Sequence, residues 1–216
     1  MKVLITGTSK GIGRAIAVKF LSMGHNVIGF DILNSTIEDK NYQHYIVDVS
    51  RGTLPNINDV EILINNAGIQ SMTEKDITVN LIGTIKVTEK YAFTDKIKSV
   101  CNIASSSAST GAEFPEYAAS KGGVLSYTKN VALRLAKYGA TVNSISPGGV
   151  KTDINDHIMK DEKLWNAVLN EALLHKWADV EEIAEWVYFI TVINKSMTGE
   201  DILIDNGEKI KSNFIW

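Results

Sequence analysis

The segment at residues 6–13, TGTSKGIG, constrains the fold of this chain more than any other. It follows a short apolar segment, residues 2–5, and opens a stretch in which Ile12, Ile16 and Phe20 recur at helical spacing. A glycine-rich turn between a strand and a helix lets a diphosphate approach the backbone, where free N–H groups of the helix bind the anion. The segment therefore predicts a strand–turn–helix unit that binds a dinucleotide.

Three glycines and one acid give this turn its chemical meaning. Gly7 allows a sharp turn off the strand, while Gly11 and Gly13 keep side chains away from the backbone. Asp31 follows the next apolar segment, residues 27–30, where an acid contacts the ribose hydroxyls of a bound dinucleotide. Because these parts occur together and in order, we interpret the segment as a dinucleotide site rather than a purely structural turn.

Strand-like apolar segments alternate with helical patterns along the whole chain. The expected strands lie near residues 2–6, 26–30, 43–47, 60–65, 98–103, 140–146 and 201–205. The expected helices lie near 12–23, 75–92, 115–137, 157–173 and 179–192, and the content of 75–92 would also suit a strand. This alternation predicts an α/β fold in one domain, residues 1–216: a single doubly wound, Rossmann-type parallel sheet of about seven strands with helices on both faces.

The crossover between the third and fourth expected strands is shortened. Only residues 50–59 separate Val49 from Val60, whereas neighbouring parallel strands usually need roughly a dozen residues or more, normally with a helix. We therefore predict a loop without a regular α-helix. One flank of the sheet would then be poorly covered, unless another element or subunit lies over it.

Composition excludes several classes of function. The formal net charge of -3 argues against nucleic acid as a partner, since binding phosphate backbones requires a basic face. No apolar run reaches the roughly 18 residues of a membrane span, and no signal peptide is visible. The four histidines are scattered without metal-ligand spacing, so we expect no metal, and Cys101 in an apolar run is expected to be an inert buried thiol. A cytoplasmic location is expected.

Tyr117 and Lys121 stand four residues apart in a strong helical pattern, so they project from one helix face. An ammonium group close to a phenol lowers the pKa of the phenol, which can then exchange a proton at neutral pH. A core tyrosine beside a surface lysine would give the same spacing by chance. The pair alone therefore indicates a candidate acid/base, no more.

Small and polar residues follow three further strands. They occur at residues 65–68 (NNAG), at 102–107 (NIASSS) and at 147–152 (PGGVKT). Because ligands of open α/β sheets bind beside the carboxyl ends of the strands, these segments should meet at one edge. Several such segments in one chain are much harder to obtain by chance than one.

In their order and spacing, these motifs resemble the classical short-chain dehydrogenase/reductase family from Thr6 to about Gly207. The matching segments are TGxxxGxG at 6–13, the acid at Asp31, Asp48-Val49, NNAG at 65–68, Asn80, YxxxK at 117–121, PGxVxT at 147–152, and Thr198-Gly199 with Asp205-Asn206-Gly207. The resemblance implies an oxidoreductase that transfers a hydride between a nicotinamide cofactor and an alcohol or carbonyl substrate. The alternative is a catalytically idle cofactor-binding module that acts as a sensor or scaffold.

The resemblance also implies a role for each matched residue. Tyr117 would be the acid/base, Lys121 would lower its pKa and hold the nicotinamide ribose, Ser105 would orient the substrate oxygen, and Asn80 would support a water relay. The residues implied to bind the cofactor are Gly7, Ser9, Gly11, Ile12, Gly13, Asp31, Asp48, Val49, Asn66, Ala67, Gly68, Tyr117, Lys121, Pro147, Gly148, Val150 and Thr152.

The chain departs from the family pattern at two places. It is shorter than typical members, and the missing length falls between Asp48 and Asn80, in the shortened crossover and the following loop. Ser105 also lies one residue closer to Tyr117 than the family serine does, which we attribute to a deletion within 106–116, with Ser106 as the alternative. Where Asn206 replaces a family glycine, asparagine tolerates a positive φ.

Cofactor, substrate and assembly follow as further expectations. Asp31 should repel a 2′-phosphate and so favours NAD, although Lys10 points toward NADP. Residues 153–177 mix apolar and charged side chains and are expected to form a lid over a small-molecule alcohol or ketone with some apolar bulk. A homodimer or homotetramer is expected through the helices near 75–92 and 115–137, because the latter has surplus apolar residues at Val124, Leu125, Val131 and Leu135.

Overall fold

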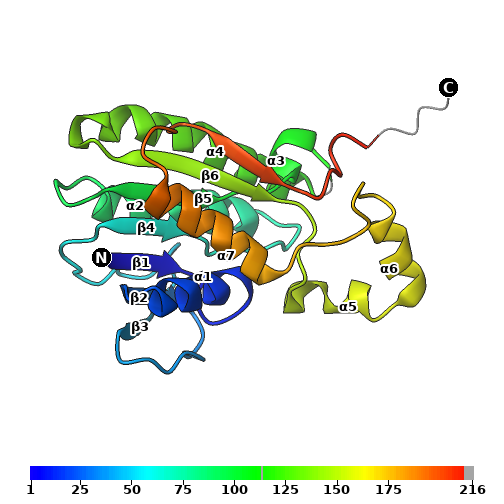
Figure 1. Cartoon of the computed structure of the whole chain (residues 1–216), viewed down its shortest axis with the longest axis horizontal. Helices are drawn as coiled ribbons and strands as arrows, with labels where there is room; N and C mark the ends of the chain where they lie inside the picture. Colours follow the sequence, from blue (N-terminus) through cyan, green and yellow to red (C-terminus); the bar gives the residue numbers. More distant parts are fainter. Residues whose placement is uncertain (113, 212–216) are drawn as a thin grey trace.

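The computed structural model describes residues 1–112 and 114–211. Its centre is one parallel sheet, whose strands within these residues are ordered β3-β2-β1-β4-β5-β6-β7 (Figure 1). Their bounds are β1 (Lys2–Thr6), β2 (Asn26–Asp31), β3 (Tyr42–Ile46), β4 (Ile62–Asn65), β5 (Ser99–Ile103), β6 (Thr141–Pro147) and β7 (Asp201–Ile204). The reversal of order beside β1 and β4 makes the sheet doubly wound, which confirms the predicted fold class.

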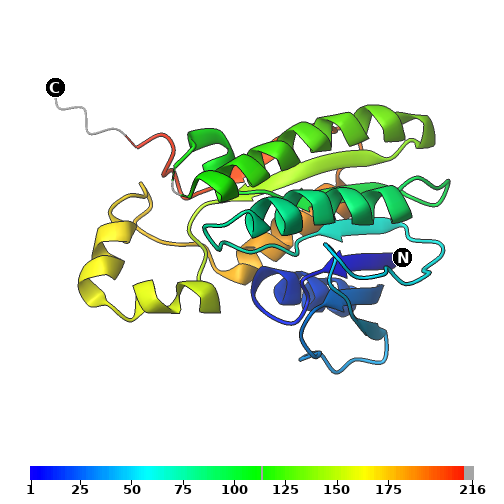
Figure 2. The same cartoon turned by 180° about the vertical axis from the view of Figure 1, so that it is seen from behind.

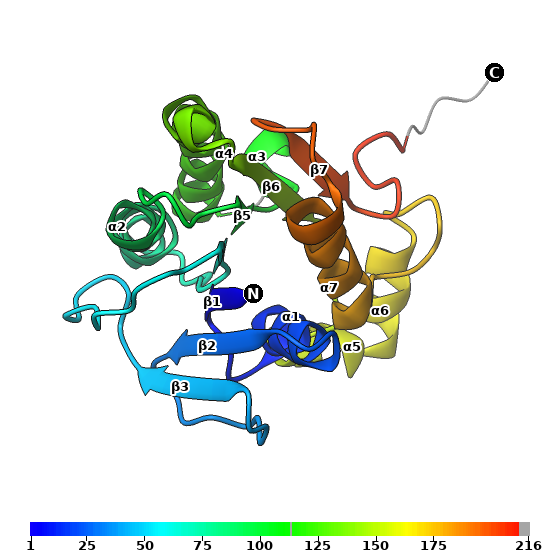
Figure 3. The same cartoon turned by 60° about the vertical axis from the view of Figure 1, so that its left-hand side comes forward.

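Helices cover both faces of the sheet (Figure 3). On one face α1 (Gly11–Ser22) and α7 (Val180–Tyr188) pack over a core that includes Ile16, Phe20 and Ile183. On the other face lie η1 (Ile77–Gly83), α2 (Thr84–Tyr91) and α4 (Pro115–Leu135), and the core there includes Val87 and Val131. The central strands are buried on both sides, as expected for a parallel sheet in two helical layers.

The predicted helices form, with two differences. Residues 77–91 are helical as predicted, but η1 is a π-helix, a wider turn than the α-helix that continues from it as α2. The predicted helix at 157–173 is wrong in extent, because it divides into α5 (Asp156–Met159) and α6 (Glu162–Leu169). Asp161 causes the division, since its carboxylate accepts the N–H of Leu164 at 3.0 Å and so caps a new helix.

Two short helical segments were not predicted from the sequence, α3 (Ser107–Thr110) and η3 (Asp153–Asn155). With four and three residues, they carry too little periodicity to detect in a sequence. Two others fall at the ends of predicted helices. η2 (Ala136–Tyr138) follows α4 at the end of the predicted 115–137, and η4 (Phe189–Ile193), a second π-helix, continues α7 within the predicted 179–192.

Within the described residues, no helix lies between β3 and β4, which confirms the predicted loop, and none lies between β2 and β3. The crossover loop after β3 is fixed to α2 instead. Lys86 and Lys90 donate to the carbonyls of Gly52 and Leu54 at 2.7 and 2.6 Å. The edge strand β3 stays partly uncovered, since Ile46 is 64% exposed.

The expectations for Asn206 and Cys101 are met, and two glycines lie just after helices in the left-handed conformation. Gly24 and Gly139 adopt φ of +78° and +68° just after helices, and Asn206 adopts +54°. Cys101 is fully buried, and burial raises the pKa of its thiol, so the group is held as the unreactive thiol. Among the described residues, no helix is long and apolar enough to cross a bilayer.

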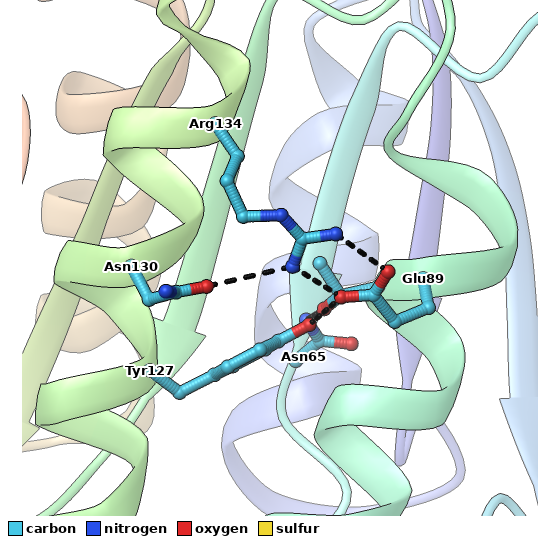
Figure 4. A network of polar contacts seen from close by, with 6 residues as sticks. Asn65, Glu89, Tyr127, Asn130 and Arg134 are labelled. Atoms are coloured by element: carbon cyan, nitrogen blue, oxygen red, sulfur yellow. Dashed lines mark hydrogen bonds and ion pairs between the residues drawn. The ribbon is translucent and has the colours of Figure 1, made fainter.

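The apolar residues of α4 do not form the surplus surface that the sequence suggested. Val124, Val131 and Leu135 are buried in the core of the chain itself, and Leu125 is half-buried. Toward solvent, α4 and the neighbouring α2 (Figure 2) are joined by a polar network (Figure 4). The argument for self-association from these residues is therefore wrong, and the homo-oligomer stays a prediction.

Candidate active site

The predicted site residues gather at the carboxyl ends of the parallel strands. The glycine-rich turn follows β1, Asp31 ends β2, Asn66 to Gly68 follow β4, Ser105 follows β5, and Pro147 ends β6. Tyr117 and Lys121 come to the same edge from the first turns of α4. Residues 153–177, the predicted lid, include α5 and α6 and project beyond this edge of the sheet in Figures 1 and 2.

The turn after β1 is locked to the loop after β4. Gly7 has a φ of +77°, and the Asn66 side-chain amide donates to the carbonyls of Thr6 and Gly7 at 3.0 and 3.2 Å. A Cβ on Gly13 would overlap the Gly7 carbonyl oxygen and the Asn66 amide. Both glycines are therefore required by close packing, as the motif predicts.

The start of α1 fits an anionic group. Its N-cap residue, Lys10, makes no side-chain cap, and its first turn has no acidic residue, so no side chain neutralises the helix N-terminus. Gly11 has a φ of +55°, and the nearest atom to a Cβ there would be Thr152 Cγ2 at 3.6 Å. Gly11 and Thr152 line the same cavity beside this helix start, which makes it the candidate site for a dinucleotide diphosphate.

Asp31 lies beside this cradle. Its two carboxylate oxygens accept the N–H groups of Ser9 and Leu33 at 2.9 and 3.0 Å, so the group is fixed between the turn and the loop after β2. A cavity of about 900 Å³ opens next to the turn, toward α1 and α7, and its lining includes Lys10 and Arg14. A carboxylate and two cations therefore flank the position expected for the adenosine ribose.

Asp48 and Val49 have different surroundings. The Asp48 carboxylate accepts from Ser50 N and Oγ and from Arg51 N at 2.8, 2.6 and 3.2 Å, and the Ser50 hydroxyl lowers the pKa of Asp48. These hydrogen bonds stay within the crossover loop. Val49 is buried, and a Cβ on Gly83 would lie 2.9 Å from its Cγ2, so this residue packs against η1.

Lys121 is 5% exposed, and its ammonium donates to the Ile103 carbonyl at the end of β5 at 2.8 Å. Nζ also lies 5.8 Å from the centroid of the Tyr117 ring, so the spacing does bring the two groups together. Burial lowers the pKa of Lys121 to about 8, an effect opposed by the negative charge of Asp76. A surface lysine, the alternative considered from the sequence, is thus excluded.

Asn80 approaches the same ammonium group. Its side chain accepts from the N–H of Ile69 at 2.8 Å and donates to the carbonyl of Ile69 at 2.9 Å and to Ser120 Oγ at 3.0 Å. A Cβ on Gly68 would lie 3.2 Å from Asn80 Oδ1 and 3.4 Å from Lys121 Nζ. Gly68, Asn80 and Lys121 therefore meet at one point.

The serines after β5 form a compact turn. Ser105 Oγ lies 3.2 Å from Ser107 Oγ and accepts the N–H of Ser107 at 3.2 Å. Ser106 donates its N–H to the Pro147 carbonyl at 2.8 Å, and both Ser105 and Ser106 are buried. The choice between Ser105 and Ser106 stays a prediction.

The segments at the two ends of the predicted lid are hydrogen-bonded to each other. Gly149 accepts the N–H of Ala178, and Ala178 accepts the N–H of Lys151, each at 3.0 Å, so Val150 and Ala178 form a parallel bridge. A Cβ on Gly149 would overlap the Trp177 indole, which packs edge-on to Trp165 with ring centroids 5.2 Å apart. The chain on either side of residues 151–177 is therefore held together by the Val150–Ala178 bridge.

Comparison with known proteins assigns this chain to a family. The family model described as enoyl-(acyl carrier protein) reductase matches residues 46–209. The 3-oxoacyl-(acyl-carrier-protein) reductase FabG of Vibrio harveyi is 31% identical over 234 residues, covering 94% of this chain and 95% of that protein. The chain belongs to the short-chain dehydrogenase/reductase family.

Solved structures agree with this assignment to the short-chain dehydrogenase/reductase family. A 4-hydroxyisoleucine dehydrogenase mutant complexed with NADH and succinate has a TM-score of 0.88 and 27% identity, covering 99% of this chain and 100% of that one. ElxO with NADP bound shares the fold, with a TM-score of 0.86 and 23% identity over 97% and 99% of the two chains.

As a short-chain dehydrogenase/reductase, the chain is an oxidoreductase that transfers a hydride between a nicotinamide dinucleotide and its substrate. Nothing in the comparisons favours an idle module. The alignment with FabG is also longer than the chain, 234 positions against 216 residues, so the relative has residues that this chain lacks.

Two residues at the site were missed in the sequence. Asp76 is fully buried next to the loop after β4, and Trp177 covers Gly149. Asp76 could have been found, since it lies four residues before Asn80 and therefore on the same helix face. Among the described residues, no three His, Cys, Asp or Glu side chains cluster as metal ligands would.

Proposed function

We propose that Tyr117 is the acid/base of this oxidoreductase and that Lys121 sets its pKa. The supporting observation is the buried Lys121 ammonium 5.8 Å from the Tyr117 ring, at the sheet edge where the dinucleotide cradle opens. A positive charge this close in a dry environment favours the phenolate. A bound nicotinamide dinucleotide supplies or accepts the hydride.

In carbonyl reduction the Tyr117 hydroxyl donates its proton to the developing alkoxide, and in alcohol oxidation the phenolate takes that proton back. Ser105 donates a hydrogen bond to the same substrate oxygen and fixes its orientation. Asn80 keeps Gly68 and Ile69 against Lys121, and so holds the ammonium in place.

The cofactor would be held by backbone groups more than by side chains. The N–H groups at the start of α1, with Gly11 and Thr152, would bind the diphosphate. Asp31 would accept the adenosine ribose hydroxyls, Asp48 and Val49 would border the adenine, and Asn66, Ala67, Gly68, Pro147, Gly148 and Val150 would line the nicotinamide half.

NAD(H) is the proposed preference. The Asp31 carboxylate is fixed at the end of β2 and would repel a 2′-phosphate at the ribose. Lys10 and Arg14 line the adjoining cavity and favour the opposite choice. We give Asp31 more weight because it lies nearer the position expected for the ribose hydroxyls.

The proposed substrate is an alcohol or ketone with an apolar portion, covered by residues 153–177 as a lid. Ile154 and Leu164 on this segment are 54% and 41% exposed, so their apolar side chains are available to contact such a substrate. The FabG relative reduces a 3-oxoacyl group, which has this chemistry. A panel of ketones of increasing chain length would test the class.

Tyr117→Phe tests the acid/base role. The variant should bind NADH with unchanged affinity in a fluorescence titration and lose nearly all turnover, because only the proton donor is removed. Tyr127→Phe, on the same helix but in the surface network, is the matched control and should keep its turnover. Retained turnover in Tyr117→Phe would remove Tyr117 from the mechanism.

Comparing NADH with NADPH on one accepted carbonyl tests the preference. We expect a higher kcat/KM with NADH, and Asp31→Ser should raise kcat/KM with NADPH because the repulsion is lost. A wild-type preference for NADPH that falls in Lys10→Ala and Arg14→Ala would assign those two residues to the 2′-phosphate and overturn the NAD(H) proposal.

A further inference from the structure

Asp76 is a buried charge without a direct ion pair. Its side chain is 0% exposed, just before η1, at the end of the loop that links β4 to that helix. Among the residues of 1–112 and 114–211, no ammonium or guanidinium group pairs directly with it. A buried carboxylate is costly unless hydrogen bonds and an opposite charge compensate it, so its position needs a reason.

The carboxylate is fixed by one residue of the loop. Ser71 donates its N–H at 2.8 Å to Oδ1 and 3.1 Å to Oδ2, and its hydroxyl at 2.7 Å to Oδ1. Asn80, one helical turn later, holds Ile69 of the same loop through both its N–H and its carbonyl. Two side chains on one helix face thus clamp residues 69–71 at both ends.

The residue that precedes this loop, Gly68, lies beside the ammonium group of Lys121. A Cβ on Gly68 would lie 3.2 Å from Asn80 Oδ1 and 3.4 Å from Lys121 Nζ, so both groups border the side of Gly68 that lacks a side chain. The other neighbours of the ammonium carry no charge, namely the Ile103 carbonyl and Gly68. In the described part of the chain, the titratable groups that face Lys121 are Tyr117 on its own helix and Asp76 ahead of η1.

We propose that Asp76 is a positioning residue that keeps Lys121 protonated and fixes the Gly68–Ser71 loop against it. The inference rests on the proposed role of Lys121. Burial alone drives the amine toward its neutral form, and a neutral amine would no longer stabilise the Tyr117 phenolate. A second buried charge of opposite sign, held by Ser71, offsets this, and the electrostatic effect of Asp76 on Lys121 has the required sign.

The test follows the Lys121 amine directly, without cofactor or substrate. The chemical shift of the carbon next to the amine is titrated by NMR in lysine-labelled protein, and its resonance is the one missing from Lys121→Arg. In Asp76→Asn we expect the midpoint to fall by about one pH unit, since an opposite charge has been lost. A midpoint equal to the wild-type value would overturn the proposal.

Two controls separate charge from structure. Glu74→Gln removes an exposed charge two residues away and should leave the Lys121 midpoint unchanged. Ser71→Ala removes one hydrogen bond to the carboxylate but keeps its charge, and should change the midpoint less than Asp76→Asn does. If Asp76→Asn does not fold, Asp76→Ala gives the same test, because it removes the same negative charge and Ser71, which loses its partner, is only partly buried.

Turnover gives a second readout. In carbonyl reduction the Tyr117 phenol and the Lys121 ammonium are both protonated, so the rate falls at alkaline pH when the first of them loses its proton. Removing a negative charge lowers the pKa of both, so this limb should move to lower pH in Asp76→Asn. A purely structural loss would reduce the rate at every pH without moving the limb.

The two proposals fail separately. A wild-type protein that binds NADH but turns over no carbonyl would defeat the proposed function and leave the NMR titration readable. An active wild type with an unmoved Lys121 midpoint in Asp76→Asn would defeat only the role of Asp76.

Discussion

Two buried bases, Lys121 and His25, show how burial acts on individual residues. Lys121 has a charged neighbour in Asp76 and a carbonyl partner in Ile103, so a charge there is partly compensated. His25 is 8% exposed between the rings of Phe20 and Tyr188, and its Nδ1 has no hydrogen-bond partner among the described residues. The surroundings of Lys121 therefore suit a charged amine, whereas those of His25 suit a neutral imidazole ring.

We expect His25 to make the fold less stable in mild acid. Burial lowers the pKa of His25 below its ordinary value of 6.5, so the unfolded chain binds the proton more readily than the folded one. Stability is therefore full above pH 6.5 and falls as the pH decreases toward the folded-state pKa.

Thermal unfolding between pH 7.5 and about 5 measures this effect. The Tm of the wild type should fall more steeply than that of His25→Gln, whereas the exposed-residue variant His157→Gln should follow the wild type. Parallel curves for His25→Gln and the wild type would show that His25 does not control the acid limb.

Contact between η1 and α4 decides the geometry of the site at the level of elements. Asn80 on η1 donates to Ser120 on α4, one residue before Lys121, and Leu81 lies against Gly123. The π-helix widens the backbone at the segment that carries Asn80, as π-bulges often do at functional sites. Of the two adjacent glycines of α4, Gly123 packs against η1 and Gly122 does not.

Alanine substitutions distinguish Gly122 from Gly123. A Cβ on Gly122 would meet only Ala108 O at 3.8 Å, an ordinary contact, so Gly122→Ala should stabilise the helix by up to about 1 kcal/mol. A Cβ on Gly123 would lie 2.6 Å from Leu81 Cδ2, so Gly123→Ala should displace the Leu81 side chain from its packing and destabilise the fold by roughly 1–3 kcal/mol.

Tm and NADH affinity measure both effects. Gly122→Ala should raise the Tm and leave the dissociation constant of NADH unchanged, while Gly123→Ala should lower the Tm and weaken binding through Asn80. Equal Tm values for the two variants would contradict the close packing of η1 on α4.

The surface of the whole molecule bears on its assembly. Arg134 on α4 and Glu89 on α2 form a bidentate pair at 2.6 and 2.8 Å, joined by Tyr127 and by Asn130 (Figure 4). These groups satisfy one another within one chain, and an exposed ion pair adds little stability by itself. Leu133, on the same helix, is a large apolar side chain and is 80% exposed.

We expect the protein to sediment as a dimer or tetramer, and Leu133→Asp to weaken that association by placing a charge in the contact. Leu174→Asp, which changes a 64% exposed residue of the lid, is the control and should keep the wild-type sedimentation coefficient. An oligomer that survives Leu133→Asp would place the contact on another surface, and a monomeric wild type would contradict the expectation itself.

The motifs of the candidate site could be predicted from the sequence: the glycine-rich turn, Asp31, NNAG, the Tyr117–Lys121 pair and the turn after β6. Each is a local pattern whose spacing dictates its own backbone shape, and parallel strands bring their carboxyl ends to one edge whatever the surrounding side chains are. The missing crossover helix was predictable for the same reason, because chain length limits what residues 50–59 can form.

The contacts between side chains of distant segments could not be predicted from the sequence. The apolar residues Val124, Val131 and Leu135 of α4 are buried in the core. The helix predicted at 157–173 divides because the Asp161 carboxylate accepts the N–H of Leu164 and caps a new helix. Asp76 lies near Lys121 through a loop held by Ser71 and Asn80, across segments far apart in the sequence. Packing between distant segments has no periodicity to read in a sequence, so burial and its effect on Lys121 emerge only from the folded chain.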